Sequence, residues 1–191
     1  MNRKYLVLGI SGLLVLILGI MLITGYNGLV KMDNNVEGKY AQIENRLQQR
    51  FELIGQILGA VSGLQQHSEN IWTMITDARA AYASAKTLDE LIAADAAQAI
   101  AFTSVLAVIE DNPQLINANS GYYALIDTIS SIESQLAVAR RDYNEAIQAY
   151  NTSVRLFPKV LYASLFGFER KLDYWKINDG TDEVPIIDFN D

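Results

Sequence analysis

The sequence predicts an all-α membrane protein, in which an N-terminal transmembrane helix leads into an elongated up-and-down helical bundle. Three observations predict this class. An uncharged apolar run lies near the N-terminus, apolar residues recur every three or four positions along most of the remaining chain, and only 3 of the 191 residues are proline. An apolar period near 3.5 keeps one stripe of each helix against a partner helix. We therefore expect three long helices and a short C-terminal helical segment.

The composition argues against several classes of function. The chain has no cysteine and a single histidine, His67, which excludes disulfides, thiolate catalysis and any site that needs two imidazoles. A net charge of −7 argues against a nucleic-acid partner, because phosphate attraction needs a basic surface. Neither a Gly-rich phosphate loop nor a Ser-His-carboxylate signature is present in the sequence. We expect no catalytic residue, no cofactor and no metal site, with His67 a partly exposed residue of the bundle.

The apolar run predicts a membrane anchor. After a short flank of residues 1–4, residues 5–25 read YLVLGISGLLVLILGIMLITG without a charge. At ~1.5 Å per residue this run is about 31 Å long, which matches the hydrocarbon core of a bilayer. A cleaved signal peptide is the alternative, but its apolar region would cover only ~7–15 residues. We expect an uncleaved span through the lipid bilayer, and the residues that mark it are Tyr5, Gly12, Gly19, Gly25 and Tyr26.

The charges beside the run predict its orientation. Arg3 and Lys4 precede it, whereas Lys31 and Lys39 follow it among acidic residues. The positive-inside rule then favours a cytoplasmic N-terminus and an extracytoplasmic bundle. The opposite orientation, with a cytoplasmic bundle, is the alternative.

The bundle is expected over residues 26–177, before an acidic tail at 178–191. Its helices are expected at about 29–84, 88–111, 120–157 and 159–170. Thr87 and Glu90 have the spacing of a capping box that starts the second helix, and Pro113 and Pro158 follow the second and third helices. The seam of the first helix comprises Val36, Tyr40, Ile43, Leu47, Arg50, Ile54, Ile57, Val61, Leu64, Ser68, Ile71, Ile75, Ala78 and Tyr82.

Helix lengths suggest how the bundle is arranged. The connection over 112–119 can stretch up to ~26 Å, which would let the first and third helices run parallel, with the second antiparallel between them. This register places Arg50 near Asp127 and Asp95 within reach of Arg79. A charge on an apolar seam needs a partner, so we expect structural ion pairs, with specification of the helix register as the next alternative. A functional carboxylate is the lesser alternative.

A stripe of small residues occurs on the first helix. Gly55, Gly59 and Gly63 are four residues apart, although each glycine costs ~1 kcal/mol in a helix interior relative to alanine. Such a stripe lets another backbone approach closely. It indicates either tight packing within one chain or a contact between copies in a homo-oligomer. A second membrane-inserting segment is a weaker alternative, because the apolar run here is short.

Several motifs resemble the LemA family. The stretch AVARRDYNEAIQAYNTSVRLFP from Ala137 to Pro158, followed by FGFE at 166–169, resembles that family, as do YNGLV at 26–30 and Asp77-Ala78-Arg79. The chain departs from the family at Tyr40, where a tryptophan is usual, and in lacking a proline within 49–57. The resemblance implies a bacterial single-pass protein of the cell membrane with a helical-bundle domain, but no particular activity. The motif residues are Arg140, Arg141, Asp142, Tyr143, Asn144, Tyr150, Asn151, Phe157, Pro158, Phe166, Gly167 and Phe168.

Two of these motifs have alternative interpretations. Tyr143 and Tyr150 lie seven residues apart on one helical stripe, and we expect them to pack in the core with their hydroxyls at its margin. A ladder that recognises another helix or peptide is the alternative. The Arg140 to Asp142 run is interpreted as a solvated face with an Arg141–Glu145 pair.

The segment from Phe157 to Ile177 contains six aromatic residues. We expect it to cover an end or a groove of the bundle, with an exposed docking surface as the alternative. The parallel register would place it at the membrane-distal end. Contact with the chain's own bilayer is then the least favoured interpretation.

These features together favour a scaffold or interaction protein. We expect a non-catalytic, membrane-anchored bundle that self-associates and contacts an unknown membrane-protein partner. The alternative is a membrane-tethered sensor whose bundle binds a peptide or a small ligand.

Overall fold

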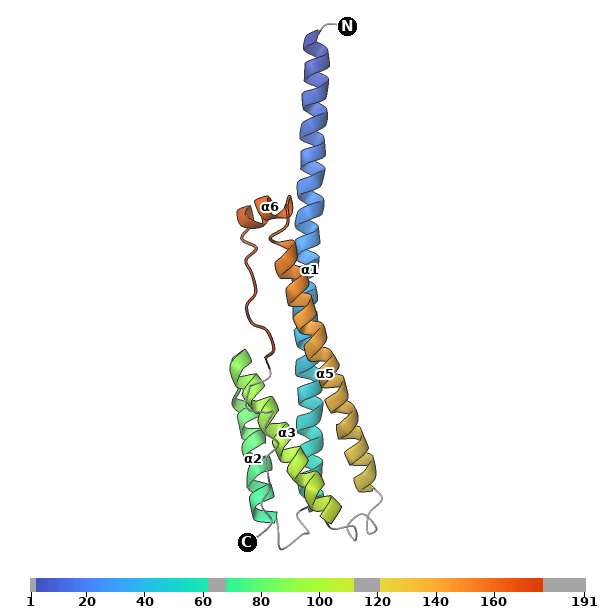
Figure 1. Ribbon diagram of the computed structural model, residues 1–191, viewed down its shortest axis with the longest axis vertical. Helices are drawn as coiled ribbons and strands as arrows, with labels where there is room; N and C mark the ends of the chain where they lie inside the picture. The colour runs from blue at the N-terminus through green and yellow to red at the C-terminus, as the bar shows by residue number, and fades with distance from the viewer. Residues whose placement is uncertain (1–2, 62–67, 112–120, 177–191) are drawn as a thin grey trace. The chain divides into compact units, whose positions relative to one another are not determined.

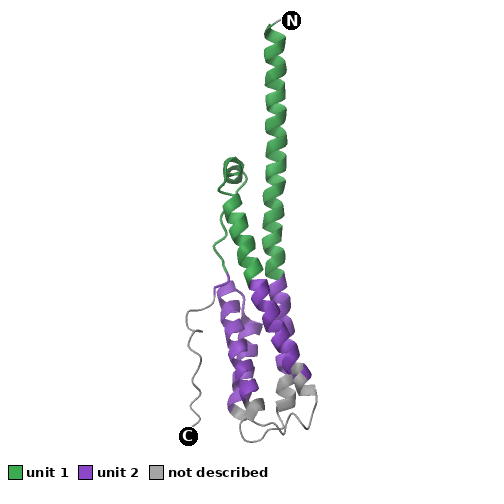
Figure 2. Ribbon diagram, turned by 45° about the vertical axis from the view of Figure 1, so that its right-hand side comes forward, with its two compact units in different colours: residues 1–41, 141–174 green, residues 42–140, 175–191 purple. Residues whose placement is uncertain are grey.

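The described part of the chain, residues 3–61, 68–111 and 121–176 of a computed structural model, forms helices and contains no strand (Figure 1). This confirms the all-α class that the sequence predicts. The helices are α1 (Arg3–Val61), α2 (Ser68–Ser84), α3 (Leu88–Asp111), α5 (Gly121–Ser153) and α6 (Lys159–Leu165). The chain divides into two compact units (Figure 2). Unit 1 holds residues 1–41 and 141–174, and unit 2 holds 42–140 and 175–191, so α1 and α5 contribute to both.

The N-terminal part of α1 exposes its apolar side chains. Large hydrophobic residues from Tyr5 to Ile23 are more than two-fifths exposed, and the first fully buried residue of the helix is Leu29. The most apolar 18-residue window of this helix has a mean hydropathy of 2.9, and none of it is buried. The helix continues without a break past Gly25 and Gly28. The apolar run and the part of α1 in unit 2 therefore belong to one helix.

The expected single helix over 29–84 is wrong. Two helices occupy this range, because α1 ends at Val61 and α2 begins at Ser68, and residues 62–67 lie outside the described part of the chain. The rings of Phe51 and Tyr82 are 5.2 Å apart, so α2 runs antiparallel to α1. An apolar period near 3.5 is the same on both arms of a helical hairpin, and it therefore cannot report where the chain reverses.

The start of α3 confirms the expected capping box. The Glu90 backbone N–H donates to the Thr87 hydroxyl at 3.2 Å, and the Glu90 carboxylate accepts from the backbone N–H groups of Lys86 (2.7 Å) and Thr87 (3.1 Å). These bonds hold the pKa of Glu90 below its usual value. The helix begins at Leu88 and ends at Asp111, both as predicted.

Thr87→Ala is expected to lower the free energy of unfolding by about 1 kcal/mol, because it removes the hydroxyl that caps the Glu90 amide. Denaturant unfolding followed by circular dichroism in detergent measures this change. Thr103→Ala is the matched control, since the Thr103 hydroxyl donates to the Ala99 carbonyl one turn earlier on the same helix and caps no helix end. An equal loss in both variants would contradict the capping role.

The expected parallel arrangement of the first and third long helices is also wrong. In unit 2, Arg50 pairs with Glu133 at 2.6 Å, and Ile54, one turn further along α1, belongs to the same buried cluster as Ile129, one turn earlier on α5. Residue numbers fall along α5 as they rise along α1, so the two helices are antiparallel. Because α2 runs antiparallel to α1, the chain reverses its direction once more than a single helix over 29–84 would allow. This additional reversal makes α5 antiparallel to α1 and not parallel to it.

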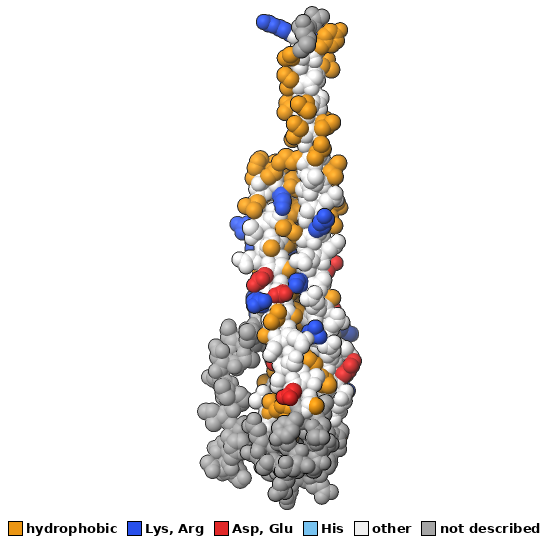
Figure 3. All heavy atoms as spheres, turned by 90° about the vertical axis from the view of Figure 1, so that its right-hand side faces the viewer, with side chains coloured by type: hydrophobic (Ala, Val, Ile, Leu, Met, Phe, Trp, Pro, Cys, Tyr) orange, Lys and Arg blue, Asp and Glu red, His pale blue; other side chains and the backbone are white. Residues whose placement is uncertain are grey.

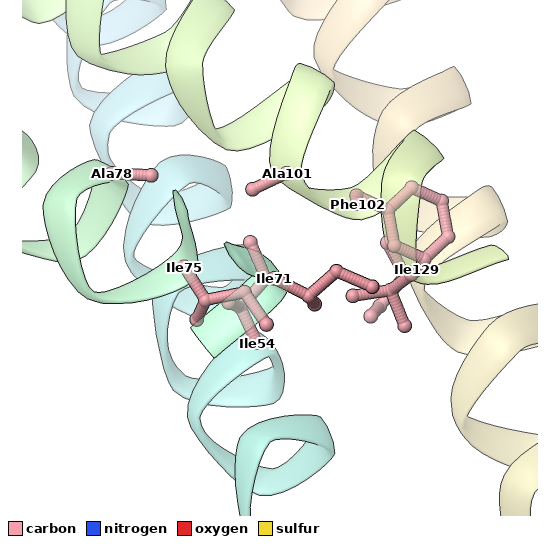
Figure 4. Packing of buried hydrophobic residues seen from close by; sticks show 8 residues of the cluster. Ile54, Ile71, Ile75, Ala78, Ala101, Phe102 and Ile129 are labelled. Carbon is pink, nitrogen blue, oxygen red and sulfur yellow. The ribbon is translucent and has the colours of Figure 1, made fainter. Parts of the chain in front are cut away.

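Four helices supply the core of unit 2. Ile54 of α1, Ile75 of α2, Phe102 of α3 and Ile129 of α5 belong to one buried cluster (Figure 4). Its other buried members are Ile71, Ala78, Ala101 and Val105. Burying an isoleucine or phenylalanine side chain is worth roughly 1.5–3 kcal/mol. This core packs α3 against α1, α2 and α5. The charged residues described next lie on three of these helices, α1, α3 and α5.

Candidate functional site

A buried arginine lies in the interior of unit 2. Arg50 is fully buried on α1, at a seam position that the sequence analysis singled out. Its Nε donates to the Gln98 amide oxygen at 3.0 Å, and its two terminal nitrogens donate to the Glu133 carboxylate at 2.6 Å and to the Asp95 carbonyl at 2.8 Å. One of these nitrogens also pairs with the Asp95 carboxylate. A single guanidinium thus joins α1 to both α3 and α5.

A second arginine completes this charge network. Arg140 of α5 contacts the Asp95 carboxylate at 2.5 Å and the Glu133 carboxylate at 3.7 Å, and its guanidinium carbon lies 5.9 Å from the ring centre of Trp175. Two arginines therefore face two carboxylates, and the cluster is balanced in charge. A buried ion pair is tolerated only when its charges are compensated and hydrogen-bonded, and this network meets both conditions.

The network corrects three sequence-based expectations. Arg50 pairs with Asp95 and Glu133 and not with Asp127, because α5 is antiparallel to α1. Asp95 contacts Arg50 and Arg140 and not Arg79. Arg140, which was expected on a solvated face, is only 19% exposed in its side chain.

Sequence reasoning did not single out Gln98 or Glu133. Each nevertheless lies on the same helical face as another residue of the network. Gln98 is three residues after Asp95, and Glu133 is seven residues before Arg140. Polar residues at three- and seven-residue spacing beside an apolar seam would have indicated a shared face. Two polar atoms of the network, Gln98 Nε2 and Arg140 Nε, are buried without a hydrogen-bond partner among the described residues.

Arg79 packs instead beside one of the three glycines. Its guanidinium carbon lies 4.4 Å from the ring centre of Phe51, and its terminal nitrogen occupies the space that a Cβ at Gly55 would need. Gly55 therefore makes room for a side chain of the same chain, as expected for packing within one chain. Gly59 belongs to α1 but its surroundings are not described, and Gly63 lies outside the described residues. The oligomer contact through this stripe remains a prediction.

In unit 1, family-motif residues of α5 hold the segment that follows α6. Asn151 is 5% exposed, and its amide nitrogen donates to the Lys171 carbonyl at 2.7 Å while its amide oxygen accepts from the Lys171 backbone N–H at 2.9 Å. The Tyr143 hydroxyl donates to the Asp173 carbonyl at 2.8 Å. Both tyrosines of the motif, Tyr143 and Tyr150, are buried. In this structure Tyr143 and Asn151 thus bind a segment of their own chain.

Ion pairs fix the same segment and the helices beside it. Lys171 pairs with Asp33 of α1 at 2.8 Å. Partial burial lowers the pKa of Lys171, but the hydrogen bond and charge of Asp33 outweigh it, so the net pKa is raised. The Lys39 ammonium, followed by the Arg141 guanidinium, lowers the pKa of the Asp142 carboxyl. The expected pair of Arg141 with Glu145 is confirmed at 3.6 Å.

The raised pKa of Tyr143 predicts that the protein loses stability at alkaline pH. Burial, followed by the charges of Asp173 and Tyr40, raises the pKa of Tyr143 from 10.0 to about 12. Folding thus favours the neutral phenol. The resulting contribution of Tyr143 to the free energy of unfolding is complete below pH ~10 and is lost as the pH rises towards ~12. Thermal unfolding measured over this range should show a steeper decline for the wild type than for Tyr143→Phe. Parallel declines in both proteins would contradict the prediction.

The remaining motif residues lie at the end of α5 and around α6. Phe157 is 79% exposed, and Pro158 occupies the N-cap of α6. Gly167 has a φ of +75°, a left-handed conformation that favours glycine. The ring of Phe166 lies 5.0 Å from that of Tyr26, and the ring of Phe168 lies 5.6 Å from it. The expectation that this aromatic segment starts far from the membrane run is therefore wrong, because α5 is antiparallel to α1.

Among residues 3–61, 68–111 and 121–176, no three His, Cys, Asp or Glu side chains are grouped as metal ligands. His67 lies outside those ranges. The carboxylates of the buried network are engaged by guanidinium groups, so this arrangement acts as an ionic cross-link between three helices.

The fold and these sites define a helical-bundle protein with a long N-terminal apolar helix. The chain belongs to the LemA family, whose sequence profile matches residues 39–189. It is similar to the magnetosome proteins MamQ 2 and MamQ 1 of Paramagnetospirillum magneticum, each 23% identical over 87% of this chain and 70% of the relative. It is also 23% identical to the magnetosome protein MamQ of Magnetospirillum gryphiswaldense, over 95% of this chain and 75% of the relative. The family match and the apolar part of α1 together support a membrane-associated helical protein.

Proposed function

We propose that this chain is a single-pass, membrane-anchored scaffold that works through protein contacts and catalyses no reaction. The observation that carries this proposal is the continuity of α1, which runs as one helix from the exposed apolar run to the buried Arg50 network. An apolar helix with exposed side chains is stable in a lipid environment and unfavourable in water. The same helix therefore connects the bilayer mechanically to a charge-specified bundle.

A single span is favoured over two. Besides α1, the 20-residue stretch Leu88–Ala107 of α3 is also long and apolar enough to cross a membrane by length and composition. However, 39% of the most apolar 18 residues of this stretch are buried, and its Asp95 and Gln98 bond to Arg50 of α1. These contacts favour α3 as a core helix of unit 2.

The charges near the apolar run support an N-terminus in the cytoplasm and a bundle outside it. Arg3 and Lys4 are the basic residues that precede the run. Since the chain has no cysteine, Ser134→Cys on the exposed side of α5 would be the single reactive thiol. A membrane-impermeant maleimide added to intact cells should label this variant, whereas labelling only after lysis would contradict the orientation.

Self-association through α1 is the form of scaffolding that the glycine stripe favours. Gly59→Leu is the informative variant, because a side chain at Gly55 would collide with Arg79 within the same chain. Chemical crosslinking in native membranes, followed by mass photometry in detergent, should give one discrete oligomer for the wild type and monomers for Gly59→Leu. A wild type that is monomeric and crosslinks to no other protein would contradict the scaffold proposal.

One groove favours a ligand-binding sensor as a second candidate. It lies between α1 and α5 in unit 2, has a volume of about 380 Å³, and is lined by Arg46, Gln49, Glu52, Leu53, Gln56, Thr128, Ser131, Ile132 and Gln135. Seven of its nine lining residues carry polar or charged side chains, which offer hydrogen-bond donors and acceptors to a polar ligand. Native mass spectrometry should then detect a bound small molecule that Ser131→Trp displaces. If the masses of the wild type and of Ser131→Trp differ only by the substitution itself, no ligand has been displaced, and this result would count against the sensor.

A further inference from the structure

The short helix α6 exposes an apolar face. Tyr162 and Ala163 are buried in unit 1, whereas Leu161 is 64% exposed and Leu165 is 74% exposed. The exposed large hydrophobic residues of the helix and its flanks, called the α6 surface below, are Leu156, Phe157, Val160, Leu161, Leu165 and Phe166. Several large exposed hydrophobic side chains on one short helix and its flanks are typical of a surface that contacts another protein or a membrane.

Contacts within unit 1 place the α6 surface beside the end of the apolar run. The side chain of Tyr162 packs against Gly25, and the ring of Phe166 lies 5.0 Å from that of Tyr26. Gly25 is the last residue of the run, and Tyr26 closes it. Figure 3 shows hydrophobic side chains along the N-terminal part of α1. If residues 5–25 fill the hydrocarbon core, the α6 surface lies at the headgroup level.

The charges around the α6 surface are mostly basic. Residues 155–171 contain four basic side chains, Arg155, Lys159, Arg170 and Lys171, against the single acid Glu169, although the whole chain has a net charge of −7. Arg155 and Arg170 are exposed, while Lys171 is paired with Asp33. No charged residue occurs between Lys159 and Glu169. An uncharged apolar face with a basic border is typical of helices that lie in the interface of an anionic membrane.

We propose that the α6 surface is a second membrane contact of this chain, lying in the headgroup region of the bilayer that α1 crosses. This inference rests on the proposed membrane anchor. A second copy of the chain is a weaker occupant, because two basic borders would face one another in a symmetric contact. The bilayer offers both the apolar depth for Leu161 and Leu165 and the anionic phosphates for Arg155 and Arg170. The contact would hold unit 1 at the membrane surface.

Fluorescence quenching by lipids measures this contact in the full chain. Three single-cysteine variants are labelled with a fluorophore and reconstituted into phosphatidylcholine vesicles that contain a minority of phosphatidylglycerol and of lipids brominated near the headgroup end. Leu161→Cys reports the α6 surface, and Leu14→Cys reports the span. Val138→Cys, an exposed apolar position of α5 in unit 2, is the matched control. We expect Leu161→Cys to lose about half of its fluorescence, as for a residue at the acyl boundary, and Val138→Cys to keep it.

The outcomes separate the two proposals. The Leu14→Cys label is read in vesicles whose lipids are brominated along the acyl chain, because this residue lies within the span. Quenching of Leu14→Cys in these vesicles, without quenching of Leu161→Cys by the headgroup-brominated lipids, overturns the α6 contact and leaves the anchor intact. Absence of quenching at Leu14→Cys with those lipids overturns the anchor itself. Fluorescence at Leu161→Cys that changes with the number of protein copies per vesicle, and not with brominated lipid, assigns the α6 surface to a second copy and also overturns the inference.

Discussion

Arg50→Leu is expected to lower the free energy of unfolding by about 3–5 kcal/mol, the largest effect of any substitution considered, because it breaks a buried charge network by removing one partner. Of the two arginines of the network, Arg140 would then be left to pair with both Asp95 and Glu133, and the buried Gln98 oxygen would lose the Arg50 donor. Leucine fills most of the space but cannot bond to these oxygens, whose desolvation is then uncompensated. Denaturant unfolding of the detergent-solubilised protein, followed by circular dichroism, measures the loss.

Arg46→Leu is the matched control for this prediction. Arg46 lies one turn earlier on α1, is partly exposed, and bonds to Gln49 on its own helix. It should change stability by no more than about 0.5 kcal/mol, as is usual for surface substitutions. The double variant Arg50→Met, Asp95→Asn leaves Arg140 paired with Glu133 and should be more stable than the Arg50→Leu single variant. Equal losses in Arg50→Leu and Arg46→Leu would show that the network does not stabilise unit 2.

Asn151→Leu is expected to release the segment that follows α6, with the second-largest effect. Asn151 bonds to both the N–H and the carbonyl of Lys171 and donates to the Tyr174 hydroxyl at 3.1 Å. Leucine would leave these backbone groups unsatisfied unless the segment detached into water. A loss of ~2 kcal/mol of local stability corresponds to roughly 30-fold more of the open form. Trypsin cleavage after Lys171 should accelerate by about that factor.

Two comparisons make the proteolysis specific. Cleavage after Arg155, which is exposed and is not held by Asn151, should proceed at the same rate in the wild type and in Asn151→Leu. Thr152→Ala, an exposed neighbour on α5, should leave both cleavage rates unchanged. If cleavage after Arg155 accelerated as much as cleavage after Lys171, Asn151 would act through the whole of unit 1 and not through the segment that it bonds.

Local signals predicted individual helices well. The bounds of α3 follow from a capping box at one end and a proline beyond the other, and both signals depend on bonds within a few residues. The apolar seam correctly placed Ile43, Leu47 and Ile54 in the interior. These features are predictable because an amphipathic helix buries the stripe that its own sequence defines.

The arrangement of the helices was not predictable in the same way. The apolar seam continues from α1 into α2, and periodicity carries no information on direction. Because this reversal was not predicted, α5 was expected in the opposite direction. The expected partners of Arg50 and the expected position of the aromatic segment were wrong for the same reason. The partners of a buried charge depend on which helix faces it, so Glu133 could be assigned to Arg50 only once α1 and α5 were known to be antiparallel.

Intact-mass analysis of the protein that remains in membranes after an alkaline carbonate wash tests most directly whether α1 anchors the mature chain in a bilayer. We expect a pellet that contains the chain with residues 5–25 retained, and a variant that lacks these residues should appear in the supernatant. A wild-type chain recovered in the supernatant, or one whose mass shows that it begins after Gly25, would contradict the claim.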